Sequence, residues 1–233
     1  MKYDFYLPRL IQGRLLRRHQ RFKADIELSD GSVITAHCPN SGSMKGCLKQ
    51  GAVVYVSESK NPNRKLRYTW QLIRLPSSLV LVNTTFTNNI VQKALVKGKI
   101  GELLGYKSIK KEYMYEPGTR IDFLLKGERP CLLEVKSCTL VEDGIAFFPD
   151  APTQRGRKHL KVLINGIKNG FRAVIFYLIH RMDANQFMPA SHIDPEYATE
   201  LAHAVESGVE ILVYDILLDL KGILLNKKIT CKL

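Results

Sequence analysis

Cysteine is scarce in this sequence, and its few copies are not spaced for a structural role. There are five cysteines in 233 residues, an odd number that includes no C-x-x-C pair. A disulfide framework or a zinc site needs paired cysteines, so neither is expected. His37 stands beside Cys38, but no second pair of ligands follows at a suitable spacing. Free thiols are typical of a reducing compartment, which predicts a cytoplasmic protein.

The sequence also lacks a long apolar segment and the phosphate-binding motifs of nucleotide enzymes. No apolar run approaches the roughly 18 residues of a membrane span, and the first residues do not resemble a signal peptide. No membrane partner is therefore expected. P-loop, G-x-G-x-x-G and G-x-S-x-G motifs are all missing. Nucleotide cofactors and serine-esterase chemistry are thus without support.

Acidic residues are in the minority, and the excess of positive charge is unevenly distributed. The net charge is +13, with 14 Lys and Arg against 5 Asp and Glu in residues 1–80 and 21 against 17 in residues 81–233. Clustered positive charge is typical of proteins that bind a polyanion, most commonly nucleic acid. DNA is therefore the expected partner, and a basic surface that only confers solubility is the alternative.

Residues 10–82 have the pattern of a series of short strands. Turn-forming pairs such as Asp30-Gly31 separate five or six apolar segments, which predicts a small barrel of the OB type. We place this domain at residues 1–83. Cations interleaved with aromatics suit a groove that follows a nucleic acid backbone, although solvated cations around an aromatic core would give the same pattern. The candidate DNA-binding residues here are Arg14, Arg17, Arg18, Arg64, Lys65 and Arg67.

From residue 84 the pattern changes to mixed helices and strands. Thr87 and Asn88 are good capping residues, and the apolar spacing after them predicts a helix that ends near Gly101 or Gly105. Continuous apolar runs at 173–179 and 209–216 are typical of buried strands. We therefore expect a second, mixed α/β domain over residues 84–233.

A further helix is expected after Thr153, and it begins with a dense group of cations. Thr153 is a suitable N-cap, and Arg155, Lys158 and His159 fall in the first two turns. Both a helix N-terminus and these side chains attract phosphate. The three residues are therefore further candidates for DNA binding.

The segment from Arg120 to Leu140 places charges in an otherwise apolar hairpin. It has the pattern of two strands joined by a turn at 126–130. Side chains alternate along a strand, so Glu134 and Lys136 share one face, and Asp122 on the preceding strand can join them. Such charges are costly to bury unless they are paired or bind a metal. A solvent-facing ion pair is the alternative interpretation.

Oxygen ligands at this hairpin would suit a hard divalent cation, Mg²⁺ or Mn²⁺. Asp122, Glu134 and the carbonyl oxygen of Val135 can supply three ligands, with water at the remaining positions. Lys136 would position or help deprotonate a water for phosphodiester hydrolysis. This is the D-x(n)-[DE]-x-K pattern of the PD-(D/E)XK nucleases, with isoleucine in place of the proline. Glu102 is a candidate additional ligand, although an exposed glutamate at a helix end fits its position too.

Seven segments of the chain together resemble the sugar fermentation stimulation protein A family of bacteria and archaea. They are AHCPNSGSMKGC (36–47), RKLRYTWQL (64–72), GELLGY (101–106), RIDFLL (120–125), LEVKSCTL (133–140), FPDAPTQRGRKHL (148–160) and RAVIFYLIHR (172–181). The resemblance spans nearly the whole chain, with Cys138 where valine is often found. It implies an OB-like domain followed by a PD-(D/E)XK nuclease-like domain, DNA binding, and a role in regulating sugar utilisation genes.

Two functions are consistent with these features. The first is a DNA-binding regulator of sugar utilisation with limited sequence specificity, because no recognition helix of the helix-turn-helix or zinc-finger type is evident. The alternative is a Mg²⁺- or Mn²⁺-dependent deoxyribonuclease with Asp122, Glu134 and Lys136 as catalytic residues. A nuclease-like fold does not by itself establish cleavage, so the assignment as an enzyme stays open. Assembly as a homodimer is also left open.

Overall fold

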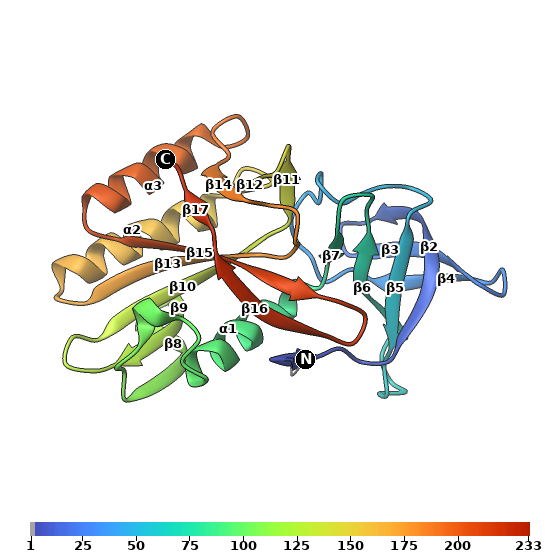
Figure 1. The fold of residues 1–233 in the computed structure, drawn as a ribbon, viewed down its shortest axis with the longest axis horizontal. Coiled ribbons are helices and arrows are strands. Elements are labelled where there is room, and N and C mark those ends of the chain that lie inside the picture. The colour runs from blue at the N-terminus through green and yellow to red at the C-terminus, as the bar shows by residue number, and fades with distance from the viewer. Residues whose placement is uncertain (1–2) are drawn as a thin grey trace.

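The computed structural model describes residues 3–233, and its barrel lies at one end of the molecule (Figure 1). The strand order β4-β3-β2-β5-β6-β7 closes through an additional ladder between β4 and β6. Alternate side chains such as Val54, Val56 and Trp70 are buried inside. The predicted OB-like barrel is therefore confirmed. Its strands are β2 (Leu10–His19), β3 (Lys23–Leu28), β4 (Val33–His37), β5 (Val53–Glu58) and β6 (Tyr68–Arg74), and β7 (Leu79–Leu81) pairs with β6 outside the closed ring.

A seven-stranded sheet forms the centre of the larger domain, as expected for an α/β fold. Its order is β1-β16-β15-β13-β10-β9-β8, and the three middle strands β15, β13 and β10 are parallel. Both faces of these middle strands are covered, which explains the continuous apolar runs of β13 and β15. The strands are β1 (Phe5–Tyr6), β8 (Ser108–Glu116), β9 (Thr119–Lys126), β10 (Cys131–Cys138), β13 (Arg172–Ile179), β15 (Glu210–Leu218) and β16 (Gly222–Lys228).

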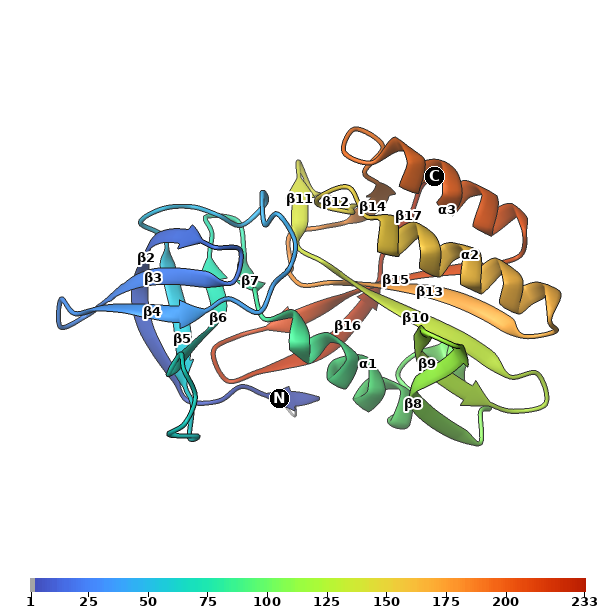
Figure 2. The same cartoon turned by 180° about the vertical axis from the view of Figure 1, so that it is seen from behind.

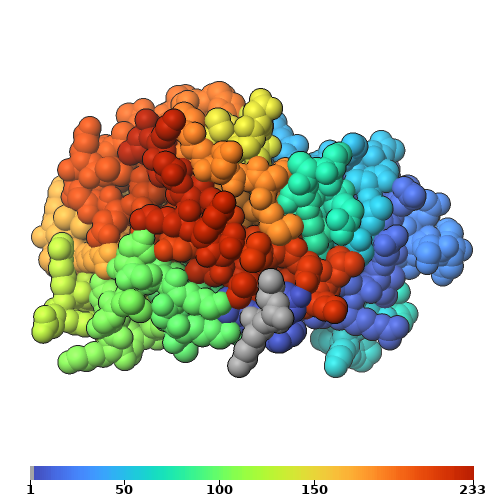
Figure 3. Space-filling view, viewed as in Figure 1, coloured from blue at the N-terminus to red at the C-terminus, as the bar shows by residue number. Residues whose placement is uncertain are grey.

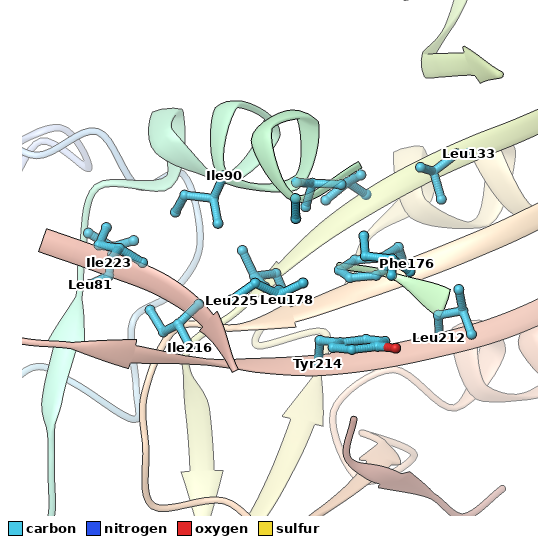
Figure 4. Packing of buried hydrophobic residues seen from close by; sticks show 14 of the residues in the cluster. Leu81, Ile90, Leu133, Phe176, Leu178, Leu212, Tyr214, Ile216, Ile223 and Leu225 are labelled. Atoms are coloured by element: carbon cyan, nitrogen blue, oxygen red, sulfur yellow. The ribbon is translucent and has the colours of Figure 1, made fainter. Parts of the chain in front are cut away.

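Helices cover the two faces of this sheet and create two hydrophobic cores. Helix α1 (Thr87–Val96) packs on one face, where Ile90 lies above the strand side chains in Figure 4, and α2 (Gln154–Lys168) and α3 (Pro195–Glu206) cover the other (Figure 2). Thr153 caps α2 as expected, through a hydrogen bond from the backbone nitrogen of Gly156. None of the helices within residues 3–233 has the length and apolar character needed to cross a membrane.

The start and end of α1 differ from the sequence prediction. A short 3₁₀ helix, η1 (Thr84–Phe86), precedes α1. The side chain of Asn83 caps η1, and neither Thr87 nor Asn88 caps α1. The helix ends at Val96, earlier than predicted, because Gly98 turns the chain with a φ of 64°. The side chains of Thr87 and Asn88 are thereby free to contact the sheet.

Two further features of the fold were not expected from the sequence. A second sheet of four short strands lies beside the first, in the order β11 (Leu140–Glu142), β12 (Ile145–Phe148), β14 (Gln186–Pro189) and β17 (Thr230–Cys231). The N-terminal strand β1 pairs with β16, so it belongs to the larger domain although the barrel follows it in sequence. The buried side chain of Asp4 secures this strand by accepting hydrogen bonds from Lys97 and Lys99, each at 2.8 Å.

The barrel and the larger domain are joined by buried polar contacts as well as by the chain itself. Arg181 donates to the carbonyl oxygens of Gly46 at 3.0 Å and Thr139 at 3.2 Å. His180 is fully buried, and its Nδ1 donates to the carbonyl oxygen of Leu81 at 3.0 Å. On the face shown in Figure 3, the end of the barrel adjoins the larger domain along a continuous boundary. The two domains therefore hold a defined relative position.

The burial of His180 predicts a loss of stability in mild acid. Burial lowers the pKa of His180 from its usual 6.5 to about 4, so the imidazole is neutral in the folded protein. As pH falls below 6.5, the unfolded chain takes up a proton that the folded protein refuses, and stability falls until pH reaches about 4. Between pH 7 and pH 5 this amounts to about 2 kcal/mol. Urea unfolding of the wild type and His180→Gln at both pH values measures it.

The prediction concerns how the free energy of unfolding changes with pH, and not its value at one pH. His180→Gln should flatten this slope even if the variant is less stable at pH 7. The matched control is His203→Gln, because His203 is exposed on α3, and it should retain the wild-type slope. Equal slopes in all three proteins would contradict the prediction.

Candidate metal and nucleic acid site

The two strands of the central hairpin stop pairing halfway along their length. β9 and β10 are paired from Leu125 and Cys131 to Phe123 and Leu133, although both strands continue. Asp122 occupies the gap, and its Oδ2 accepts a hydrogen bond from the backbone nitrogen of Val135 at 2.7 Å. The N–H and C=O groups of one residue leave a strand on the same side. The carbonyl oxygen of Val135 therefore faces the same gap.

Helix α1 supplies a residue that positions the Asp122 carboxylate. The Nδ2 of Asn88 donates to Oδ1 of Asp122 at 2.8 Å, so both carboxylate oxygens are oriented, one from the helix and one from β10. Sequence reasoning treated Asn88 only as a helix cap. Its position at the start of a helix after the barrel was the sole signal, and its contact with Asp122 depends on how the helix packs.

Glu134 lies on the face of β10 that is turned toward α2, and it is almost completely buried. Its exposed fraction is 2%, and its Oε1 accepts hydrogen bonds from Nζ of Lys136 and Nδ1 of His159. Burial alone would raise the pKa of Glu134, but Lys136 and His159 outweigh it and hold the pKa below its ordinary value. Oε2 is buried and has no hydrogen-bond partner among residues 3–233. The predicted pairing of Glu134 and Lys136 on one face is thus present.

The electrostatics of the two carboxylates fit a divalent cation. Burial, together with the negative charge of Glu134, raises the pKa of Asp122 to about 6. A raised pKa reports a carboxylate whose charge is incompletely compensated, and the bare Oε2 of Glu134 is a second such feature. A cation held between Asp122, Glu134 and the Val135 carbonyl would relieve both. The residues present therefore fit the expected Mg²⁺ or Mn²⁺.

Two carboxylates and one carbonyl oxygen are enough ligands for a hydrated cation. Within residues 3–233, no three or more His, Cys, Asp or Glu side chains come together as a metal-binding cluster. Mg²⁺ needs only one or two carboxylates because it keeps several waters. Glu102 does not join the pair. It accepts hydrogen bonds from Tyr214 at 2.8 Å and Lys228 at 2.6 Å, because it follows the C-terminal end of α1 while the N-terminal end faces Asp122.

Asp122 and Glu134 open into a pocket of about 770 Å³ with a basic rim, which we call the acidic pocket. Arg155 and Lys158 extend from the first turns of α2, and both are exposed. Arg120 on β9 is exposed beside them, a residue that the sequence reasoning did not select. The lining residues are Ser41, Glu112, Met114, Gly118, Thr119, Arg120, Asp122, Glu134, Val135, Lys136, Arg155, Lys158 and His159.

The three candidate DNA-binding residues of α2 lie at the acidic pocket but differ in their environment. His159 is buried against Glu134, and its Nε2 lies 3.4 Å from Nε of Arg155. It therefore orients the carboxylate, whereas Arg155 and Lys158 are accessible to a ligand. Helical spacing explains the arrangement, since positions three or four apart lie on one face.

The candidate DNA-binding residues of the barrel lie outside the acidic pocket, and several have partners within the protein. Arg17 pairs with Asp25 at 2.7 Å, and Arg67 pairs with Glu58. Two others have longer polar contacts. The guanidinium of Arg14 lies 3.3 Å from the Gly51 carbonyl oxygen, and that of Arg64 lies 3.3 Å from Nδ1 of His37. Lys65 is exposed.

Arg18 has a structural role that its sequence position did not reveal. Its guanidinium donates to the carbonyl oxygens of Asn40, Gly42 and Ser43 at 2.9 to 3.2 Å. This holds the loop at residues 40–43 in the form that brings Ser41 to the acidic pocket. The barrel thus contributes to the site through a loop.

Residues 16–82 match the SfsA N-terminal OB domain, and residues 85–222 match the sugar fermentation stimulation protein RE domain. A sugar fermentation stimulation protein homolog from Geobacter sulfurreducens is 47% identical over 224 residues, which cover 96% of this chain and 97% of the relative. A homolog of the same name from Shewanella baltica (strain OS155) is 49% identical over 213 residues, or 90% and 91% of the two chains.

A solved structure has the same fold over the whole length. The structure of Pyrococcus furiosus SfsA in complex with Ca²⁺ superposes with a TM-score of 0.91 and is 26% identical, and the alignment covers 100% of both chains. The matches cover both domains in the expected order. The chain belongs to the sugar fermentation stimulation protein family.

Proposed function

We propose that this protein binds DNA at the acidic pocket, with a divalent cation between the two carboxylates and the phosphate backbone. The observation that carries the proposal is the joint position of Asp122, Glu134 and the exposed cations Arg120, Arg155 and Lys158 in one pocket. The cations attract phosphate, and the carboxylates alone would repel it. A divalent cation removes this conflict because it binds carboxylate and phosphate oxygens together.

A structure of a relative supports the metal part of the proposal. The Pyrococcus furiosus SfsA structure is described as a complex with Ca²⁺. Ca²⁺ and Mg²⁺ are both hard cations that take oxygen ligands, which is the donor set of Asp122, Glu134 and the Val135 carbonyl. The regulatory role that the sequence resemblance implies would depend on the DNA binding proposed here.

Hydrolysis of the bound DNA is a second candidate function, and the position of Lys136 favours it. Lys136 reaches the same pocket as the carboxylates, its side chain is only 13% exposed, and its ammonium contacts Glu134. A bound Mg²⁺ would polarise a phosphate and lower the pKa of a water molecule. Lys136 would orient that water and accept or donate a proton. A protein that only binds DNA has little need for this arrangement.

The first prediction concerns DNA binding by the cations of α2. The double variant Arg155→Ala/Lys158→Ala should bind DNA at least about tenfold more weakly, because two phosphate contacts are lost, and its salt dependence should decrease by up to about two in log–log slope. Fluorescence anisotropy with labelled DNA over a salt series measures both quantities. Lys107→Ala/Lys126→Ala is the matched control, since both side chains are exposed and lie outside the acidic pocket, and it should stay close to wild type. Affinity that barely responds to salt would count against DNA binding altogether.

The second prediction concerns the cation. Calorimetric titration with Mn²⁺ should show binding to the wild type and at least about tenfold weaker binding to Glu134→Gln, because a hard cation prefers a charged carboxylate to an amide. Glu102→Gln is the matched control, since Glu102 is engaged with Tyr214 and Lys228, and it should bind like wild type. Equal Mn²⁺ affinity in all three proteins would remove the proposed metal site.

The third prediction concerns cleavage. Purified protein is incubated with single- and double-stranded DNA in Mg²⁺, Mn²⁺ or EDTA. Metal-dependent cleavage should fall by about 100-fold or more in Lys136→Ala, because the loss of a group that transfers a proton has an effect of that order. Lys161→Ala on α2 is the control for the loss of one lysine. Lys161 lies outside the acidic pocket, so this variant should cleave like wild type. Retained DNA without cleavage, with Mn²⁺ bound, would leave DNA binding in place and exclude hydrolysis.

A further inference from the structure

A second cavity lies beside the acidic pocket, at the junction of the barrel and the larger domain. It has a volume of about 270 Å³, and we call it the junction cavity. One wall is the barrel loop at residues 40–42, and the other is the segment 147–153 that leads into α2. Part of β10, from Val135 to Cys138, forms the base between them.

The junction cavity adjoins the acidic pocket along β10. Ser41, Val135 and Lys136 line both of them. Strand β10 passes from Glu134 in the acidic pocket to Ser137 and Cys138 in the junction cavity, at about 3.3 Å per residue. The two spaces are therefore neighbours, with Lys136 between them.

The walls of the junction cavity are held in place before any ligand binds. The backbone nitrogen of Met44 donates to Oδ2 of Asp150 at 2.9 Å, which connects the barrel loop to the opposite wall. At Gly42 a Cβ atom would lie 2.4 to 2.6 Å from the Asp150 carboxylate oxygens, so only glycine allows this close approach. A preformed cavity costs little ordering free energy when a ligand enters.

The lining suits a nucleobase better than a phosphate. Polar atoms form the larger part of the surface, and apolar side chains form the rest, namely Val135, Phe147, Phe148, Pro149, Ala151 and Pro152. Backbone groups of the loop at 40–42 add polar atoms, and Arg21 lies at the edge, where its guanidinium donates to the Ser41 carbonyl oxygen at 2.8 and 3.0 Å. A base presents apolar faces and a polar edge, which match such a surface. A phosphate would meet the carboxylate of Asp150 as well as the cations Arg21 and Lys136.

We propose that the junction cavity receives the base of the nucleotide next to the phosphate bound in the acidic pocket. This inference depends on the proposed function, and it specifies the substrate class. A cavity of this size holds one base and not a base pair, so that nucleotide is unpaired when it is bound. The protein therefore prefers single-stranded DNA, or duplex DNA with an unpaired or frayed nucleotide, over fully paired duplex.

The test fills the junction cavity without altering the acidic pocket. Ala151 lines the junction cavity but not the acidic pocket. Ala151→Trp should therefore block entry of a base, and Ala151→Ser is the control with a small side chain. Oligonucleotides that carry 2-aminopurine at successive positions are titrated with protein in Ca²⁺. The expected result is a fluorescence increase at one position in wild type and Ala151→Ser, because the base leaves its stack, and no increase in Ala151→Trp.

Affinity for the two forms of DNA completes the test. Wild type should bind a single strand at least tenfold more tightly than the matched duplex, and Ala151→Trp should lose this preference while it keeps wild-type affinity for duplex, which also shows that the variant is folded. Equal affinity of wild type for both forms, or an unchanged fluorescence increase in Ala151→Trp, overturns the inference and leaves the proposed function intact. A wild-type protein that binds no DNA of either form overturns both.

Discussion

The buried carboxylate of Glu134 is the constraint on which the candidate site depends. A buried carboxylate without partners costs several kcal/mol, and here Lys136 and His159 compensate it at one oxygen only. His159 reaches Glu134 from α2, and the same helix places Arg155 and Lys158 at the rim of the acidic pocket. One helix therefore supplies both the partner of the buried carboxylate and the cations that would attract a phosphate.

The larger domain opens its sheet where the site requires space. β9 and β10 separate after Phe123 and Leu133, and Asp122 replaces the missing ladder contact by accepting from Val135. The barrel then encloses the neighbouring space through its loop at residues 40–43, which Arg18 holds. Neither domain has the complete set of walls alone. The polar contacts of Arg181 and His180 at the junction thus matter for the site as well as for stability.

Sequence reasoning succeeded where the information is local. Short apolar segments separated by turn-forming residues predicted the strands of the barrel, continuous apolar runs predicted β13 and β15, and Thr153 predicted the start of α2. The pairing of Glu134 with Lys136 followed from strand periodicity. Sequence reasoning was less successful where a side chain contacts a residue that is far away in the sequence. Thr87 and Asn88 have the composition of a cap, yet Asn88 positions Asp122.

The sequence by itself determined the two-domain α/β architecture, the basic charge and the three charged residues of the central hairpin, because these depend on composition and on short-range periodicity. The tertiary structure alone decided which charges meet. In the folded protein, Glu102 contacts Lys228 and Tyr214, and Arg18 contacts the carbonyl oxygen of Asn40. Ser41 of the barrel lines the same pocket as Lys136. These outcomes depend on the packing direction of α1 and on the junction between domains, which residues far apart in the chain determine together.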